Sequence, residues 1–214
     1  MLQKLEEADI KKIYKELSEK LKIAGKYDVA RPSPFCISPE SVRAIVLGAD
    51  PSTKDGKTFS YVFDLDPNNP SDDRYFKGIE DNLKLVGLTM SDIYVQNVCQ
   101  NYFLKETGEQ QKDWEKAAKV WIPYLKKELD ANFDKDVPVI ATAEIIMKAL
   151  LKDGVELASA KSIYSAKYKI PFSKSSNKLG RPLIPIYRHF QYTLKEKKWN
   201  DYKNRVTEYL DKGK

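Results

Sequence analysis

The chain has 214 residues, of which 42% are hydrophobic and 32% charged, and this suits one α/β domain or at most two small ones. A mean hydropathy of −0.56, without any apolar run of about 18 residues, excludes a membrane span. An aromatic content of 11% excludes a disordered chain. The 37 basic and 31 acidic residues leave a net charge of +6, which is compatible with a polyanionic partner but does not require one.

The cysteines and the histidine are few. Cys36 and Cys99 cannot make a disulfide framework, and a single histidine excludes an ordinary Cys/His zinc cluster. The N-terminal sequence is charged throughout, which is not typical of a secretory signal peptide. These features together predict a cytoplasmic protein with reduced thiols.

The hydropathy pattern predicts a helix followed by alternating strands and helices. Residues 2–22 place apolar side chains at helical spacing, and the Pro-rich residues 31–39 follow as an irregular connection. The remaining elements are strand 42–48, loop 48–74, helix 75–87, strand 91–98, helix 109–129, strand 137–142, helix 144–151, an irregular polar segment 163–181, strand 182–188 and helix 195–210.

This alternation predicts a three-layer α/β/α sandwich with a central parallel sheet of four strands. We expect residues 1–41 to pack as a helix and connecting segment on the α/β domain formed by residues 42–214, giving a single domain overall. In an open parallel sheet the ligand lies beyond the carboxyl ends of the strands. The polar residues at those ends are therefore candidates for one cleft: Asp50, Asn97, Thr142 and His189.

The loop after the first strand carries two patterns that bear on function. Gly56, Lys57 and Thr58 match the end of a phosphate-binding loop, but Pro51 stands where that motif needs glycine, and no helix follows. Both departures argue against a nucleoside-triphosphatase site. Asp50, at the mouth of the strand, is instead suited to hold and polarise a water, although an ordinary Asp-Pro turn explains it better when it is taken alone.

Three other residues and one loop have both a structural and a functional interpretation. His189 suits hydrogen bonding to a developing anion near neutral pH, whereas a lone histidine is more often structural. Asn97 interrupts an apolar strand, where its amide either makes a structural bond or reads a nucleobase edge. Phe59 stacks on a base or fills the core, and residues 174–178 contact phosphates or are plain surface.

Taken together, these residues resemble the motifs of the uracil-DNA glycosylase superfamily. Gly48, Asp50 and Pro51 match three positions of its G-Q-D-P-Y-H motif, and the pair Phe59-Ser60 matches the Phe-Ser pair that follows. Residues 95–98 are similar to its apolar strand ending in Asn, and residues 184–189 are similar to its strand running into H-P-S. The order and spacing agree over residues 42–205.

The resemblance implies a DNA-repair enzyme that flips uracil or a related damaged base out of DNA and hydrolyses its N-glycosidic bond. Asp50 would position water and stabilise the cationic sugar, and His189 would hydrogen bond the departing base. Asn97 would read the base edge and Phe59 would stack on its face. The other residues implied in substrate binding are Gly48, Ala49, Pro51 and Ser52. No metal or organic cofactor is implied.

The resemblance also implies a monomer that binds DNA near this site, without a membrane. One of Phe190, Tyr192 and Leu194 would be the wedge that fills the stack left by the flipped base. The candidate DNA-binding residues are Thr142, Lys174, Ser175, Ser176, Phe190 and Tyr192.

The chain departs from the family motifs at several flanking positions. Ser52 and Thr53 replace the Tyr and His of the first motif, and Phe190 and Gln191 replace the Pro and Ser that follow the histidine. Residues 141–143 lack the glycine of the phosphate-contacting turn. These departures leave the base open, and they leave two alternatives: a catalytically weak or inactive nucleic-acid-binding module of the same fold, and a hydrolase of nucleosides or nucleotides.

Overall fold

A computed structural model describes residues 2–68, 74–165 and 168–212, which form mixed α/β structure with a mostly parallel sheet. Residues 69–73 of the expected loop 48–74, and residues 166–167 of the expected irregular segment 163–181, lie outside the described residues. Within the described part of the chain, no helix combines the length and apolarity that a membrane crossing needs.

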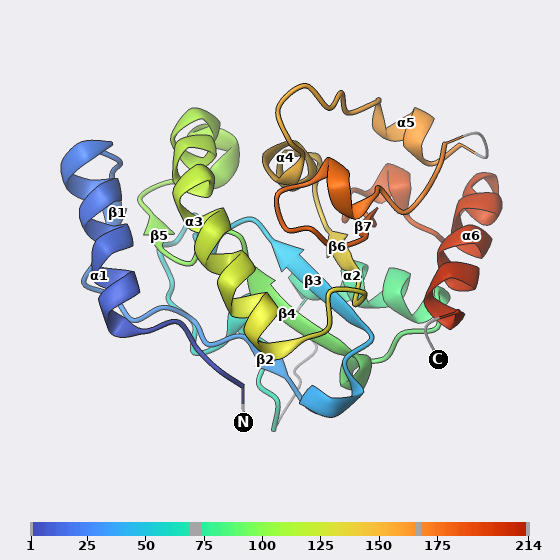
Figure 1. Cartoon of the computed structure of the whole chain (residues 1–214), viewed down its shortest axis with the longest axis horizontal. Helices are drawn as coiled ribbons and strands as arrows, with labels where there is room; N and C mark the ends of the chain where they lie inside the picture. The colour runs from blue at the N-terminus through green and yellow to red at the C-terminus, as the bar shows by residue number, and fades with distance from the viewer. Residues whose placement is uncertain (1, 69–73, 166–167, 213–214) are drawn as a thin grey trace.

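The main sheet has five strands in the order β2-β4-β3-β6-β7 (Figure 1). Its four parallel strands are β3 (Ala44–Gly48), β4 (Ile93–Asn97), β6 (Val139–Ala141) and β7 (Leu183–Pro185). The sequence predicts four strands, and the structure adds a fifth. This is β2 (Phe35–Cys36), which pairs antiparallel with β4 at the edge of the sheet. The sequence pattern does not show β2 because two residues between prolines leave no alternation to detect. A separate small sheet pairs β1 (Gly25–Lys26) with β5 (Tyr102–Phe103).

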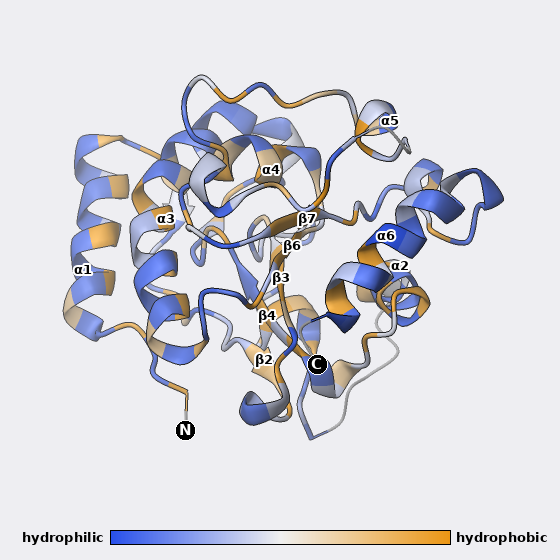
Figure 2. Cartoon of the chain, turned by 45° about the vertical axis from the view of Figure 1, so that its right-hand side comes forward, coloured by the Kyte–Doolittle hydropathy of each residue, from blue (hydrophilic) through white to orange (hydrophobic). Residues whose placement is uncertain are grey.

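Helices lie on both sides of the main sheet. In Figure 2, α1 and α3 lie to one side of the apolar strands, and α2 and α6 lie to the other. The helices are α1 (Glu7–Lys15), α2 (Arg74–Leu85), α3 (Gln111–Asn132), α4 (Glu144–Leu150), α5 (Ala160–Ile163) and α6 (Asn200–Asp211). The first predicted helix, residues 2–22, is shorter in the structure: α1 begins at Glu7, and it passes into a π-helical turn over Glu16–Lys20.

The register of the parallel strands brings their carboxyl ends to one edge. Gly48 is the partner of Asn97, and Ala141 is the partner of Pro185. Beyond β7, the N–H of Arg188 donates to the carbonyl of Thr142 at 2.9 Å, so the chain stays at this edge. The segments after β3, β4, β6 and β7 therefore begin side by side, as the alternating pattern predicts.

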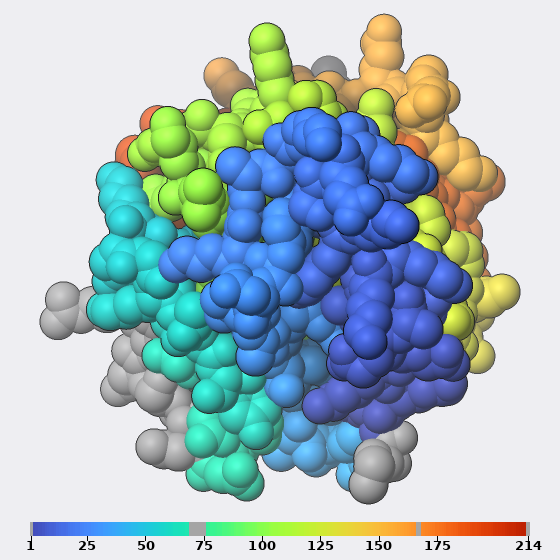
Figure 3. Space-filling view, turned by 90° about the vertical axis from the view of Figure 1, so that its left-hand side faces the viewer, coloured from blue at the N-terminus to red at the C-terminus, as the bar shows by residue number. Residues whose placement is uncertain are grey.

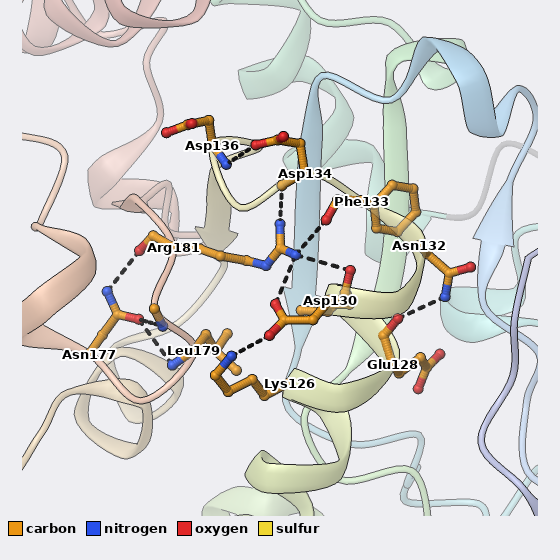
Figure 4. Close-up of polar contacts among 12 residues, drawn as sticks. Lys126, Glu128, Asp130, Asn132, Phe133, Asp134, Asp136, Asn177, Leu179 and Arg181 are labelled. Carbon is orange, nitrogen blue, oxygen red and sulfur yellow. Dashed lines mark hydrogen bonds and ion pairs between the residues drawn. The ribbon is translucent and has the colours of Figure 1, made fainter.

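Arg181 ties the start of β7 to the carboxyl end of α3 (Figure 4). Its side chain is fully buried, and its guanidinium donates to the carbonyls of Leu129 at 3.0 Å, Phe133 at 2.8 Å and Asp134. It also pairs with the carboxylate of Asp130 at 3.0 Å. The last carbonyls of a helix have no partner within the helix, and a cation there is favoured by the helix dipole. Arg181 supplies both the donors and the charge.

We expect Arg181→Met to lower the free energy of unfolding by about 3 kcal/mol, because several buried carbonyls lose their donors at once. Urea denaturation measures this loss. The matched control is Lys126→Met, which removes the more exposed cation that also pairs with Asp130 and changes stability by less than about 1 kcal/mol. Equal losses in the two variants would contradict the capping role of Arg181.

Candidate functional site

The centre of the candidate site is a close approach at the ends of β3 and β4. A Cβ atom on Gly48 would lie 2.3 Å from Oδ1 of Asn97 and 2.5 Å from Cζ of Phe63. Only glycine therefore lets the amide of Asn97 and the ring of Phe63 meet over the strand end. Phe63 in turn packs against Phe76 of α2, with ring centroids 5.2 Å apart.

Asn97 carries an unused hydrogen-bond acceptor. The residue is 1% exposed, and its Oδ1 is buried without a hydrogen-bond partner. Leaving such a group unpaired costs about 1–3 kcal/mol, so it is uncommon in proteins and needs an explanation. The main-chain N–H of Asn97 does have a partner, since it donates to Oε1 of Gln96 at 2.9 Å. The site thus holds a fixed acceptor at the carboxyl edge of the sheet.

The structure brings Phe63, rather than the predicted Phe59, to Asn97. Phe59 is half-buried, and its N–H donates to the hydroxyl of Tyr102 in β5 at 2.8 Å. Phe63 has a left-handed backbone with φ of 57°, which is strained for an aromatic residue. The available signal was an apolar run, residues 61–63, inside a polar loop; Val62 is fully buried and anchors the loop.

Asp50 is held by its own turn and by the segment that follows β5. One carboxylate oxygen accepts from the N–H of Ser52 at 2.9 Å, and the other accepts from the hydroxyl of Thr107, a partner that sequence reasoning missed. Burial raises the pKa of the Asp50 carboxyl above its ordinary value, and the hydrogen bonds from Ser52 and Thr107 partly offset this. Each oxygen has a second lone pair, so the carboxylate can still accept from a water.

His189 begins the short 3₁₀ helix Phe190–Tyr192 at the same edge of the sheet, and it is exposed. Its Nδ1 accepts from the N–H of Gln191 at 3.3 Å, and its ring stacks on Phe190 with centroids 4.6 Å apart. Because Nδ1 is the acceptor, the neutral imidazole carries its proton on Nε2. His189 therefore offers Nε2 as a hydrogen-bond donor.

The three candidate wedge residues differ in exposure. Leu194 is fully buried, and Tyr192 is half-buried against Trp199 with ring centroids 5.9 Å apart. Phe190 is 75% exposed, so it is the one of the three that presents an apolar surface to an incoming ligand.

Other predicted DNA-binding residues are engaged within the protein. The hydroxyl of Thr142 donates to the carbonyl of Leu47 at 2.7 Å. Lys174 forms an ion pair with Asp136, which precedes β6, so the 3₁₀ helix Lys174–Ser176 lies near the amino ends of the strands. The hydroxyls of Ser175 and Ser176 bond within their own turn, to Oγ and the carbonyl of Ser173. The structure does not bring Lys174, Ser175 and Ser176 together with Asn97.

The remaining predicted residues lie beside Asp50. Pro51 is buried, and Oγ of Ser52 accepts from the N–H of Phe103 at 2.7 Å. The carbonyl of Ala49 accepts from the N–H of Cys99 at 3.0 Å. These contacts fix the turn after β3 to the segments that follow β4.

A cavity of about 490 Å³ lies on the N-terminal side of the molecule, the face viewed in Figure 3. It is formed by α1, residues 27–34, Gln96 and Glu128. The predicted cleft at the strand ends differs from this cavity, because the cavity is lined by none of the residues expected at that cleft or in base stacking: Asp50, Phe59, Asn97, Thr142 and His189.

No model of a known protein family and no curated protein sequence matches this chain. Among residues 2–68, 74–165 and 168–212, no group of three or more His, Cys, Asp or Glu side chains is arranged to hold a metal ion.

We expect Gly48→Ala to destabilise the protein by about 1–3 kcal/mol, because its Cβ must displace Asn97 or Phe63 in a packed region. Urea denaturation measures the change. The matched control is Gly78→Ala in α2, where a new Cβ meets nothing within 4 Å. Since alanine is the better helix former, this control gains up to about 1 kcal/mol. A neutral Gly48→Ala would show that the two side chains are not confined.

Proposed function

We propose that this protein is a DNA glycosylase that hydrolyses the N-glycosidic bond of uracil, or of a related damaged base, flipped out of DNA. The observation that carries the proposal is the buried and unpartnered Oδ1 of Asn97 beside the ring of Phe63. An acceptor next to an aromatic face suits a flipped base, which is bound through its edge and its face together.

The acceptor at Asn97 also favours one kind of base. Uracil presents an N3–H donor beside a carbonyl oxygen, which complements an amide that offers one acceptor and one donor. Cytosine presents N3 as an acceptor, and this would face Oδ1 without a proton between them. Asn97 therefore supports uracil over cytosine by the mismatch of buried polar groups, which is the strongest form of discrimination available to a binding site.

Asp50 supports the hydrolytic step. As the bond between base and sugar breaks, positive charge develops on the sugar, and a nearby carboxylate stabilises that charge. The same carboxylate accepts a hydrogen bond from the water that attacks the sugar carbon. The contacts from Ser52 and Thr107 fix its orientation before the reaction begins.

His189 and Phe190 support the departure of the base and the opening of the stack. Nε2 of His189 donates to the base oxygen on which negative charge develops. Phe190, with 75% of its surface exposed, is the wedge that fills the vacated position. The +6 net charge supports binding to phosphates.

The remaining parts of the proposal rest on the resemblance of the sequence motifs to the uracil-DNA glycosylase superfamily. We propose the three-layer α/β/α architecture of the uracil-DNA glycosylase superfamily, with β2 added at one edge of the sheet. We also propose that the protein acts as a cytoplasmic monomer.

A second candidate is a binding module of the same fold with little or no catalysis. The observation that favours it is that both oxygens of Asp50 already accept hydrogen bonds from the protein. In that case Asp50 is a turn residue, and the site binds a flipped base without cleaving its bond.

Asp50→Asn decides between these candidates. We expect it to slow single-turnover excision of uracil by about a hundredfold or more, because the lost charge acts on the transition state alone. Affinity for DNA, measured by fluorescence anisotropy, stays near that of the parent, and in both proteins it falls steeply with salt. Excision at the parent rate would leave Asp50 as a turn residue.

The pH profile tests the same carboxylate. Excision needs the ionised form, so the rate falls as pH drops through the pKa of Asp50. Because burial raises that pKa, the fall begins at a higher pH than for an ordinary aspartate. Thr107→Val removes a donor to the carboxylate and moves the fall to still higher pH. A profile unmoved by this substitution would contradict the assignment.

Asn97→Asp tests base recognition. An ionised carboxylate offers acceptors only, so the donor to the base is lost. At about 1–3 kcal/mol, this loss slows uracil excision about five- to 150-fold and shifts preference towards cytosine. The measurement is excision from matched uracil and cytosine oligonucleotides.

The matched control is Asn82→Asp on α2. Oδ1 of Asn82 accepts from the N–H of Leu194 at 2.8 Å, and a carboxylate preserves this bond. The control therefore retains the parent rates. Unchanged relative rates in Asn97→Asp would make Asn97 a structural residue.

A further inference from the structure

The main-chain N–H of Asn97 lies where the sheet supplies no partner strand. β2 pairs with Val95 and Tyr94 only, and the continuing antiparallel register would place Ser33 opposite Asn97. Ser33 bonds elsewhere: its N–H donates to the carbonyl of Ser60 at 2.7 Å, and its carbonyl accepts from Val62. The N–H of Asn97 is satisfied instead by the side chain of Gln96, at 2.9 Å.

The direction of the Gln96 amide is set by Glu128 of α3. Nε2 of Gln96 donates to Oε1 of Glu128 at 3.1 Å. An ionised carboxylate only accepts hydrogen bonds, so it must face the NH₂ group of the amide. The carbonyl oxygen of Gln96 is then the atom that faces Asn97. The charge on Glu128 thereby fixes which end of Gln96 meets the main chain of β4.

Glu128 is itself held by neutral donors. It is 5% exposed, and it accepts from the hydroxyl of Tyr94 at 2.6 Å and from Nε2 of Gln100 at 3.0 Å. Burial and the adjacent carboxylate raise the pKa of Tyr94 well above its ordinary value, so this hydroxyl stays a donor. A buried carboxylate satisfied by three side chains is rigid, because each bond constrains the others.

We propose that Glu128 is a positioning residue of the candidate site: through Gln96 it fixes the main chain of Asn97 and so the aim of the Asn97 amide. The inference rests on the proposed function, because it assigns the purpose of this aim to base recognition. It adds a residue on the far side of β4 that does not touch the base.

The cavity of about 490 Å³ makes this proposal testable, since both Gln96 and Glu128 line it. Removing the Glu128 side chain leaves a space continuous with the cavity, and a small carboxylate can enter and replace the missing group. A neutral molecule of the same shape fills the space without orienting Gln96.

The first experiment compares Glu128→Gln with Glu115→Gln, the same substitution at an exposed position of the same helix. We expect Glu128→Gln to lower kcat for uracil excision at least tenfold while KM for DNA stays within twofold. The substitution also reduces the preference for uracil over cytosine. It speeds hydrogen exchange of the main-chain N–H of Asn97 at least tenfold. The control changes none of these, and an unchanged kcat or Asn97 exchange rate in Glu128→Gln overturns the proposal.

The second experiment is chemical rescue of Glu128→Ala, after urea unfolding confirms that this variant folds. We expect acetate to raise the kcat of Glu128→Ala at least fivefold and to slow hydrogen exchange of the main-chain N–H of Asn97. Acetamide does neither. Asp50→Asn gains nothing from acetate. Rescue by acetamide equal to that by acetate, or no rescue by acetate, overturns the proposal.

The proposed function and the positioning role of Glu128 are contradicted by different results. If the parent protein excises no base, the proposed function fails. The exchange rate of the main-chain N–H of Asn97 then decides by itself whether Glu128 holds this residue. If the parent is active and the Asn97 exchange rate in Glu128→Gln matches the parent, the proposed function stands and the positioning role of Glu128 fails.

Discussion

The candidate site depends on one contact that a side chain at Gly48 would prevent. Because β3 ends in a residue without Cβ, the amide of Asn97 and the ring of Phe63 come together over the sheet edge. Asp50 follows Gly48 by two residues, and Gly48 is the register partner of Asn97, so the parallel pairing of β3 and β4 brings the carboxylate segment to the end of the strand that carries the acceptor. The chemistry of the edge is therefore a property of the sheet rather than of a loop alone.

Helix α3 is the frame behind that edge. Near its carboxyl end Glu128 holds Gln96 on β4, and the carboxyl end itself is closed by Arg181, which precedes β7 (Figure 4). One helix thus fixes two parallel strands that lie on either side of β3 and β6. His189 follows β7, and Asn97 ends β4. Because α3 is bonded to both strands, it helps to fix the relative position of these two residues, which share no hydrogen bond in the described chain.

The sequence predicts the four parallel strands well, because buried strands are apolar on both faces and their flanking turns are polar. It also predicts that Asp50, Asn97 and His189 follow strand ends at one edge. It misses β2, which is too short for any period, and it misses Phe63, whose approach to Asn97 depends on a left-handed turn that no local pattern marks. Lys174 looked like a phosphate contact by composition, but only the fold shows that its partner Asp136 lies at the opposite edge.

The unpartnered oxygen of Asn97 also makes the empty protein less stable than its packing allows. A side chain chosen for stability alone would not leave a buried acceptor without a donor, so the folded state without ligand carries a penalty that an occupied site removes. Apolar replacements at this position are then among the substitutions that raise thermal stability while removing function. Any selection of this chain for heat resistance alone would act against the residue that gives the site its chemistry.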